Sequence, residues 1–237
     1  MTREVNAAVE GALEGGATEI WVADGHGQYN NILLEELHPG ACLVSGKPRL
    51  FGMMGGLDCG PWDGLFLIGY HARAGAHGVL AHTINGSAFA EVRINGAPVG
   101  EYYLNGLLAG EYDVPVRLIS GDDRLAKEAV SVYPNAEIVT VKRALSTAAV
   151  HQPIGVVHKA LHVAAQKALR NVSCKPLKLA GPFSVQVSTV RTYHADLFCM
   201  LPGAKRLSPT CLEFIADTPF AISRTLNCFS SMAASVH

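Results

Sequence analysis

The sequence has few charged residues and no long apolar run. Only 16% of its 237 residues are Asp, Glu, Lys or Arg, and the formal net charge is −1. Like charges do not form runs, so a nucleic-acid surface or an anionic membrane patch has no electrostatic support. No apolar stretch reaches the roughly 18–20 residues that span a bilayer, and the acidic N-terminal segment is unlike a secretory signal. We expect neither a nucleic-acid nor a membrane partner.

Paired cysteines and the common nucleotide and nucleophile motifs are also missing. The six cysteines are widely spaced and none forms a C-x-x-C pair. This spacing argues against a disulfide scaffold or structural zinc site, and it favours reduced thiols in the cytoplasm. The chain contains no G-x-G-x-x-G, G-x-x-x-x-G-K-[ST] or G-x-S-x-G. The usual arguments for dinucleotides, nucleoside triphosphates and serine hydrolysis are therefore absent.

Apolar residues, by contrast, are plentiful. They make up 49% of the chain, and the mean hydropathy is +0.21. This length and composition suit one large globular domain or two smaller lobes with a sizeable core. The apolar excess is somewhat more than a monomer needs to bury, which mildly favours an oligomer.

Helical and strand patterns alternate along the chain, which is typical of the α/β class. Residues 64–71 form a nearly unbroken apolar run, the pattern of a strand buried on both faces. Asn95-Gly96 predicts a hairpin turn, and Asp122 or Asp123 is the expected N-cap of the helix that follows. The patterns predict helices at residues 3–14, 103–112, 123–133, 153–172 and 218–234, and strands at 19–24, 64–71, 90–94, 99 onward, 114–123, 136–142 and 183–190.

These elements predict a mixed, largely parallel sheet flanked by helices, followed by a less regular C-terminal α+β portion. We place the boundary between an α/β domain at 1–148 and a C-terminal portion at 149–237, which we expect to supply packing and oligomer contacts. The first helix leads directly into a strand, whereas such a helix normally connects two strands. We therefore expect the first domain to be N-terminally incomplete.

Candidate ligands follow the predicted strands. His26 and His71 come after strands, and Glu101 comes after the hairpin. Ligands bind beyond the carboxyl ends of strands in open α/β sheets, so these side chains converge if the strands are neighbours. Two imidazoles and a carboxylate suit zinc, manganese or iron. His82 is either a general acid/base or substrate anchor, or else a polar strand residue. His77 is expected to face solvent. A lone histidine after a strand is more often a hydrogen-bonded loop residue than a ligand.

Four segments together resemble a known family. They read "ADGHG", "NNILLEELHPGACLVSG", "GLFLIGYHARAGAHGVLAH" and "INGAPVGEYYLNGLLAGEYDVPVRLISGDD". In these motifs and their spacing the chain resembles the zinc-dependent D-aminopeptidases of the dipeptide-permease operon type. The most specific part is "GYHARA", followed eleven residues after its histidine by a second histidine and then by "VGE". The resemblance runs from about residue 1 to 145 and fades toward the C-terminus.

The resemblance implies roles for four residues. His26, His71 and Glu101 match metal ligands of the family, and His82 matches a histidine that takes part directly in catalysis. His77 matches no functional residue. Family members hold two zinc ions per subunit and carry a D-x-E-G motif that supplies the remaining ligands. That motif does not occur in this chain, so the resemblance supplies only part of the ligand set.

The resemblance also implies a reaction and an assembly. Family members remove an N-terminal D-residue such as D-alanine from short peptides, and they form ring-stacked decamers with active sites facing an inner channel. Because the acidic motif is missing, a catalytically inactive homologue that binds peptides or serves as a structural oligomer is the alternative. A metal-dependent hydrolase or amidase with another small substrate is a third possibility.

Overall fold

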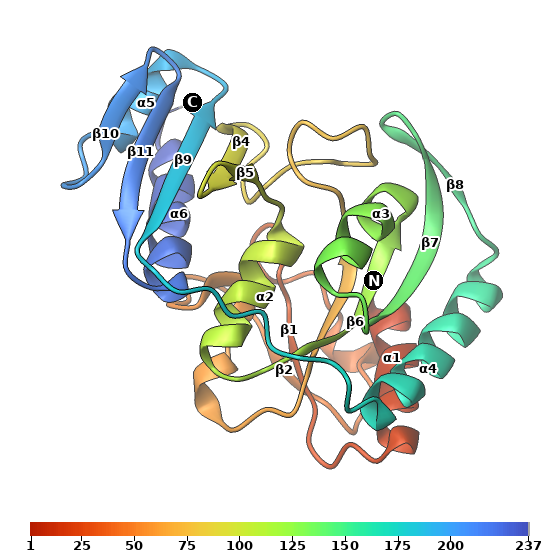
Figure 1. The fold of residues 1–237 in the computed structure, drawn as a ribbon. Helices are drawn as coiled ribbons and strands as arrows, with labels where there is room; N and C mark the ends of the chain where they lie inside the picture. Colours follow the sequence, from red (N-terminus) through yellow and green to blue (C-terminus); the bar gives the residue numbers. More distant parts are fainter. Residues whose placement is uncertain (237) are drawn as a thin grey trace.

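The computed structural model describes residues 1–236, whose strands form two main sheets and one short parallel pair (Figure 1). The first sheet has the order β3-β6-β7-β8. Its first three strands are parallel, because helices connect them, and the last is antiparallel. These strands are β3 (Leu65–Tyr70), β6 (Val116–Asp122), β7 (Glu137–Leu145) and β8 (Ala148–His151).

Helices cover both faces of this sheet. On one face, α1 (Thr2–Gly15) and α4 (Ile154–Arg170) pack side by side, and their Ala8 and Leu161 share a core with Leu118 of β6. On the other face, α3 (Asp123–Val132) and α2 (Glu101–Glu111) enclose a second core. The predicted mixed, largely parallel sheet flanked by helices is confirmed.

The second sheet is antiparallel and has the order β10-β11-β9-β4-β5. Its strands are β4 (Phe89–Ile94), β5 (Ala97–Pro98), β9 (Phe183–Thr189), β10 (Lys205–Ser208) and β11 (Cys211–Ala216). Two helices, α5 (Thr192–Phe198) and α6 (Pro219–Ala233), pack on it and form the largest core with its alternate residues. In Figure 1 this sheet and α6 lie opposite the first sheet, with α2 between them.

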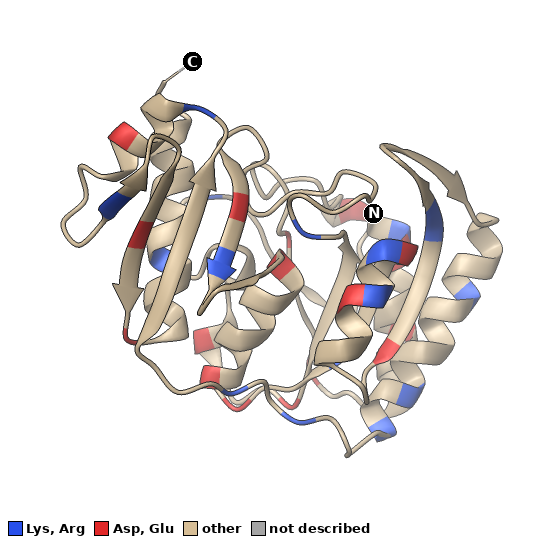
Figure 2. Ribbon diagram, turned by 45° about the horizontal axis from the view of Figure 1, so that its top comes forward, with Lys and Arg blue, Asp and Glu red and all other residues tan. Residues whose placement is uncertain are grey.

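Short elements lie between α1 and β3 along the chain. The parallel pair consists of β1 (Trp21–Ala23) and β2 (Cys42–Val44), and the 3-10 turns are η1 (Leu34–Glu36), η2 (Gly52–Met54) and η3 (Leu57–Cys59). Among residues 1–236 no helix is long and apolar enough to cross a bilayer. Figure 2 shows acidic and basic residues interspersed along the helices, as in the sequence of α3.

Two details of the sequence prediction are wrong. The apolar run predicts that β3 is buried on both faces, but β3 lies at the edge of its sheet and only Leu67 is buried. In place of the expected strand from residue 99 onward, the hairpin ends at Pro98, and α2 begins at Glu101, two residues earlier than predicted. Glu101 therefore stands in the first turn of a helix. The sequence patterns do not predict the strands β2, β8, β10 and β11 or the helix α5.

Elements on each side of the proposed boundary between residues 148 and 149 pack with elements from the other side. β4 and β5 precede this point and pair within the sheet that also contains β9, whereas α4 follows it and packs on α1. The division into 1–148 and 149–237 stays a prediction.

Close contact between α1 and α4 depends on Gly11. A Cβ at this position would lie 2.1 Å from the carbonyl oxygen of His162, which belongs to the backbone of α4. We expect Gly11→Ala to lower the free energy of unfolding by about 1–3 kcal/mol, because a backbone cannot move aside as a side chain can. Gly155 is the matched control, since it lies in α4 and a Cβ added there would have no atom within 4 Å.

The control should behave in the opposite way. Replacing a helical glycine by alanine in open space stabilises by about 0.4–1 kcal/mol, so Gly155→Ala should raise the urea midpoint while Gly11→Ala lowers it. Equal midpoints for the two variants would show that α1 and α4 are not in close contact.

Candidate metal centre

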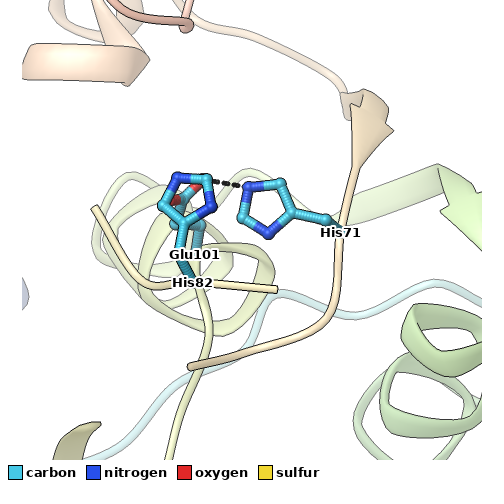
Figure 3. Close-up of side chains that lie close together, drawn as sticks. All are labelled: His71, His82 and Glu101. Carbon is cyan, nitrogen blue, oxygen red and sulfur yellow. Dashed lines mark ion pairs between the residues drawn. The ribbon is translucent and has the colours of Figure 1, made fainter. Parts of the chain in front are cut away.

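Three chain segments meet beside the carboxyl end of β3. His71 follows the last residue of β3, and Glu101 is the first residue of α2. His82 lies in the long connection between β3 and β4. Figure 3 shows the two imidazole rings and the carboxylate pointing toward one another. The predicted position, at the carboxyl end of a parallel strand, holds for His71.

The distances make these side chains one group. Nε2 of His71 lies 3.4 Å from Oε2 of Glu101, and Nε2 of His82 lies 3.4 Å from its Oε1. The two imidazole rings stack with their centroids 4.0 Å apart. Each residue offers one ligand atom, and these atoms lie within 4.8 Å of one another. The carboxylate is nearly buried, with 6% of its side chain exposed.

Main-chain carbonyls orient both histidines. Nδ1 of His71 lies 3.0 Å from the carbonyl oxygen of Ala72, and Nδ1 of His82 lies 2.6 Å from that of Leu80. A carbonyl oxygen only accepts, so each Nδ1 carries the hydrogen, and in the neutral rings the lone pair is on Nε2. Both lone pairs and the carboxylate then face the same small space. A cation is the natural occupant of such a donor set, and its nitrogen and oxygen chemistry fits zinc.

The short distances between these side chains shift the pKa values of His71 and Glu101. Burial opposes protonation of His71, but the hydrogen bond and the charge of Glu101 outweigh it and raise the pKa of His71. Burial likewise opposes ionisation of Glu101, yet the two histidines and a backbone N–H lower the pKa of this carboxyl. The backbone donor is the N–H of Ile84, 2.7 Å from Oε1. Electrostatics in the site therefore favour an ionised carboxylate next to positive charge.

Ile84 gives this N–H in an unusual conformation. Its φ is 63°, in the left-handed region that β-branched residues rarely adopt. Such strain persists only where surrounding contacts impose it, and it concentrates at functional sites. Here the conformation directs a backbone donor at the Glu101 carboxylate.

Thr83 ties the three segments of the site together. Its side chain is fully buried. The hydroxyl accepts from the N–H of Ala74, at 3.1 Å, and lies 3.2 Å from the carbonyl oxygen of Val99, to which it donates. Ala74 lies in the segment that carries His71, and Val99 lies in the segment that leads into Glu101. The Thr83 hydroxyl therefore joins these two segments through hydrogen bonds. Nothing in the sequence marks a threonine beside a histidine for this role.

We expect Thr83→Val to weaken the site. Valine matches threonine in shape but leaves a buried donor and acceptor unpaired, which costs about 1–3 kcal/mol of stability. Loss of such support typically reduces metal affinity by about 10–100-fold. Zinc affinity measured with a competing chelator checks this, and Thr83→Ser should restore it. Unchanged affinity in Thr83→Val would remove Thr83 from the account.

Asp122 also holds the connection between β3 and β4, which carries His82. This buried carboxylate caps α3 by accepting from the backbone N–H groups of Arg124 and Leu125, at 3.0 and 2.8 Å. Asp122 is one of the two residues that the sequence predicts as the N-cap. Its other oxygen accepts from the N–H of Val79, 2.8 Å away, in the connection that carries His82. The cap thus fixes both a helix and the loop.

The structure does not bring His26 into this group. His26 is exposed, and its backbone N–H donates to the Asp24 carboxylate at 3.2 Å. Burial opposes ionisation of Asp24, but N–H groups of this loop outweigh it and lower the pKa of its carboxyl. His26 as a ligand stays a prediction. His77 is exposed, as predicted.

An α/β fold that gathers two imidazoles and a carboxylate at the end of a parallel strand is typical of metal-dependent hydrolases. A protein-family model described as D-aminopeptidase, peptidase family M55, matches residues 1–228. The chain belongs to this family of D-aminopeptidases.

A known sequence and a solved structure, both from Bacillus subtilis, agree with this assignment. A D-aminopeptidase of Bacillus subtilis (strain 168) is 44% identical over 150 residues, which cover 63% of this chain and 54% of the relative. The match thus spans about half of that relative's length. The solved structure of Zn-dependent D-aminopeptidase DppA from Bacillus subtilis, described as a self-compartmentalizing protease, superimposes with a TM-score of 0.94 at 33% identity. That match covers 98% of this chain and 85% of the solved chain.

Proposed function

We propose that this chain is a zinc-dependent aminopeptidase that removes N-terminal D-amino acids, of the D-alanine type, from short peptides. The observation that carries the proposal is the convergence of His71, His82 and Glu101 in a chain of the D-aminopeptidase family. The structural relative is named as zinc-dependent, which favours zinc among the metals that this donor set suits.

His71 and Glu101 would hold the ion, and the resemblance adds His26 and a second zinc site. Bound zinc supplies polarisation of the scissile carbonyl and a lowered pKa for the attacking water. Glu101 contributes negative charge in a nearly dry position, where electrostatic interactions are strong. The carbonyl of Ala72 fixes the His71 ring so that Nε2 faces the site.

His82 is the proposed catalytic residue. Its Nε2 faces the same space as the ligands, and its ring is about a quarter exposed, which leaves it open to a substrate and to water. Nδ1 is held by the Leu80 carbonyl, so only Nε2 is available to exchange a proton or to donate a hydrogen bond. In that position His82 stabilises the charge that develops on the substrate carbonyl, or it carries a proton to the leaving amine.

We further propose that the chain assembles with copies of itself in the cytoplasm, as the ring-stacked decamer that the resemblance implies. Support comes from large apolar side chains that the single chain leaves exposed, such as Leu34, Ile154 and Met200. The structural relative is described as self-compartmentalizing. Short peptides are the proposed substrates, because only small molecules enter an internal compartment freely.

The test is turnover of D-alanine p-nitroanilide and its L-enantiomer by the protein before and after adding zinc. We expect zinc-dependent release of p-nitroaniline from the D-substrate and little from the L-substrate. His77→Ala is the control, because this exposed histidine has no place in the group. A folded protein that binds zinc but cleaves neither substrate would instead support an inactive, peptide-binding homologue.

A further inference from the structure

Two residues on either side of His82 have a backbone conformation that leucine and isoleucine rarely adopt. Leu80 has a φ of 53° and Ile84 a φ of 63°, both in the left-handed region. Within residues 1–236 they are the only aliphatic residues in this region, and both stand beside a histidine of the three-residue group. The other non-glycine residues there are Tyr29, Asn95, Asp113 and Ser146.

Packing does not explain the conformation of Leu80. Its side chain is 66% exposed, so burial of that side chain does little to hold the backbone in place. Glycine would adopt a positive φ without steric cost, and asparagine adopts it more readily than leucine. Strain of this kind persists only where surrounding contacts impose it. The cause therefore lies in the neighbouring backbone.

Hydrogen bonds hold the chain on both sides of Leu80. Before it, the N–H of Val79 donates to the buried carboxylate of Asp122 at 2.8 Å. After it, the buried Thr83 hydroxyl bonds to two other segments of the site. Only three residues separate these two anchors, so the chain must turn sharply between them. In this turn the carbonyl oxygen of Leu80 reaches the His82 ring and lies 2.6 Å from Nδ1.

The other histidine of the site shows what is particular to this contact. Nδ1 of His71 also lies near a carbonyl oxygen, at 3.0 Å, but this carbonyl belongs to Ala72, the next residue along the chain. Ala72 has no positive φ. The acceptor for His82 comes two residues before the ring, which requires the chain to fold back on itself. The left-handed Leu80 supplies that reversal.

We propose that Leu80 is a positioning residue for His82, and that its left-handed backbone rather than its side chain has this role. The Leu80 carbonyl accepts from Nδ1–H, which leaves the lone pair of the neutral ring on Nε2. The proposed function, on which this inference rests, uses Nε2 to exchange a proton. Another φ at Leu80 would move the carbonyl away from the ring while Val79 and Thr83 stay held.

Four variants at position 80 separate the backbone from the side chain. Leu80→Gly and Leu80→Asn remove the apolar side chain but enter the left-handed region readily. Leu80→Pro excludes this region because its ring fixes φ at about −65°. Leu80→Val keeps an apolar side chain, but a β-branched residue is an outlier in this region. A role of the leucine side chain would spare Leu80→Val and harm Leu80→Gly, which is the opposite of what we expect.

The first readout is the tautomer of His82, which a merely structural role of Leu80 would not change. It is measured by NMR on protein labelled with nitrogen-15 histidine, before metal is added and at a pH where the ring is neutral. His82→Ala identifies the signal by its absence. We expect the hydrogen on Nδ1 in the natural sequence, in Leu80→Gly and in Leu80→Asn. In Leu80→Pro and Leu80→Val we expect a mixture of the two tautomers.

The second readout is steady-state kinetics on D-alanine p-nitroanilide with zinc added. Leu80→Pro and Leu80→Val should lower kcat by at least about 10-fold, which is part of the about 10²–10⁴-fold that a positioned acid or base contributes. KM and zinc content should stay as in the natural sequence, because Leu80 touches neither His71 nor Glu101 through any hydrogen bond found within residues 1–236. Leu80→Gly and Leu80→Asn should keep the natural kcat.

Three results would overturn the proposal. One is a natural sequence whose neutral His82 carries its hydrogen on Nε2. Another is a folded Leu80→Pro that keeps both the Nδ1–H tautomer and the full kcat; if Leu80→Pro does not fold, Leu80→Val decides by the same criterion. The third is a loss of kcat in Leu80→Gly and Leu80→Asn as large as in Leu80→Pro, which would assign the role to the side chain.

Failure of the proposed function is recognised separately. If neither the natural sequence nor any variant cleaves the anilide, the peptidase fails, and the tautomer alone decides the role of Leu80. Hydrogen on Nδ1 in the natural sequence and Leu80→Gly, but not in Leu80→Pro or Leu80→Val, supports Leu80 as a positioning residue in a protein that is not a peptidase. The same tautomer in all four variants overturns it.

Discussion

Glu101→Gln is expected to abolish zinc-dependent turnover and to weaken zinc binding by at least about 100-fold, the upper end of what loss of a supporting group alone produces. Glutamine keeps the size of the side chain and an oxygen that accepts from Ile84 N–H. It removes the negative charge that lies 3.4 Å from both histidines. Zinc titration against a competing chelator measures the loss, and thermal unfolding shows that the fold is kept.

Glu91→Gln is the matched control for this variant. Glu91 also takes part in an ion pair, with its carboxylate 2.6 Å from Nε of Arg93, but it lies outside the three-residue group. A partly exposed pair of this kind contributes little to stability, so zinc affinity and turnover should stay at the level of the natural sequence. Unchanged zinc affinity in Glu101→Gln would mean that the carboxylate is not a ligand.

His82→Ala is expected to lower kcat by about 10²–10⁴-fold, the usual contribution of a positioned acid or base, while zinc stays bound. The reason is the proposed division of roles, in which His71 and Glu101 hold the metal and His82 acts on the substrate. Steady-state kinetics on D-alanine p-nitroanilide and zinc content of the same sample check both parts. His71→Ala, measured in parallel, should lose zinc as well as activity.

Distances alone do not separate the two roles, because Nε2 of His82 is as near to Glu101 as Nε2 of His71 is. If His82→Ala and His71→Ala lose zinc to the same extent, His82 is a ligand and the assignment of roles is wrong. If His82→Ala retains both zinc and full turnover, the catalytic role falls instead.

Local patterns are enough to predict most of the first sheet and its helices. β6 and α3 are predictable because a buried apolar run and an Asp cap are signals within a few residues. The second sheet is harder to predict because β4 pairs with β9, far along the chain, and no local signal reports that pairing. β11 alternates in burial, but its residues Cys211–Ala216 are nearly all apolar, so the sequence does not show that alternation. β8 carries no such signal either.

Residue types and the family resemblance predict the site only partly. His71, His82 and Glu101 do converge, since a strand end, a loop and a helix start meet there. The prediction of His26 beside them depends on where a loop side chain points, and in the structure Asp24 holds the His26 backbone while the residue stays exposed. Thr83 acts through a buried hydroxyl that joins residues distant in sequence. Only the folded chain reveals such a contact.

The most direct test of the account is the zinc content of the purified protein by elemental analysis, with D-alanine p-nitroanilide turnover read on the same sample before and after adding zinc. We expect about one zinc ion or more per chain, as the nitrogen and oxygen donors require, together with turnover that a chelator removes and zinc restores. A correctly folded protein that takes up no zinc from excess metal, and shows no turnover, would contradict the metal centre on which the account depends.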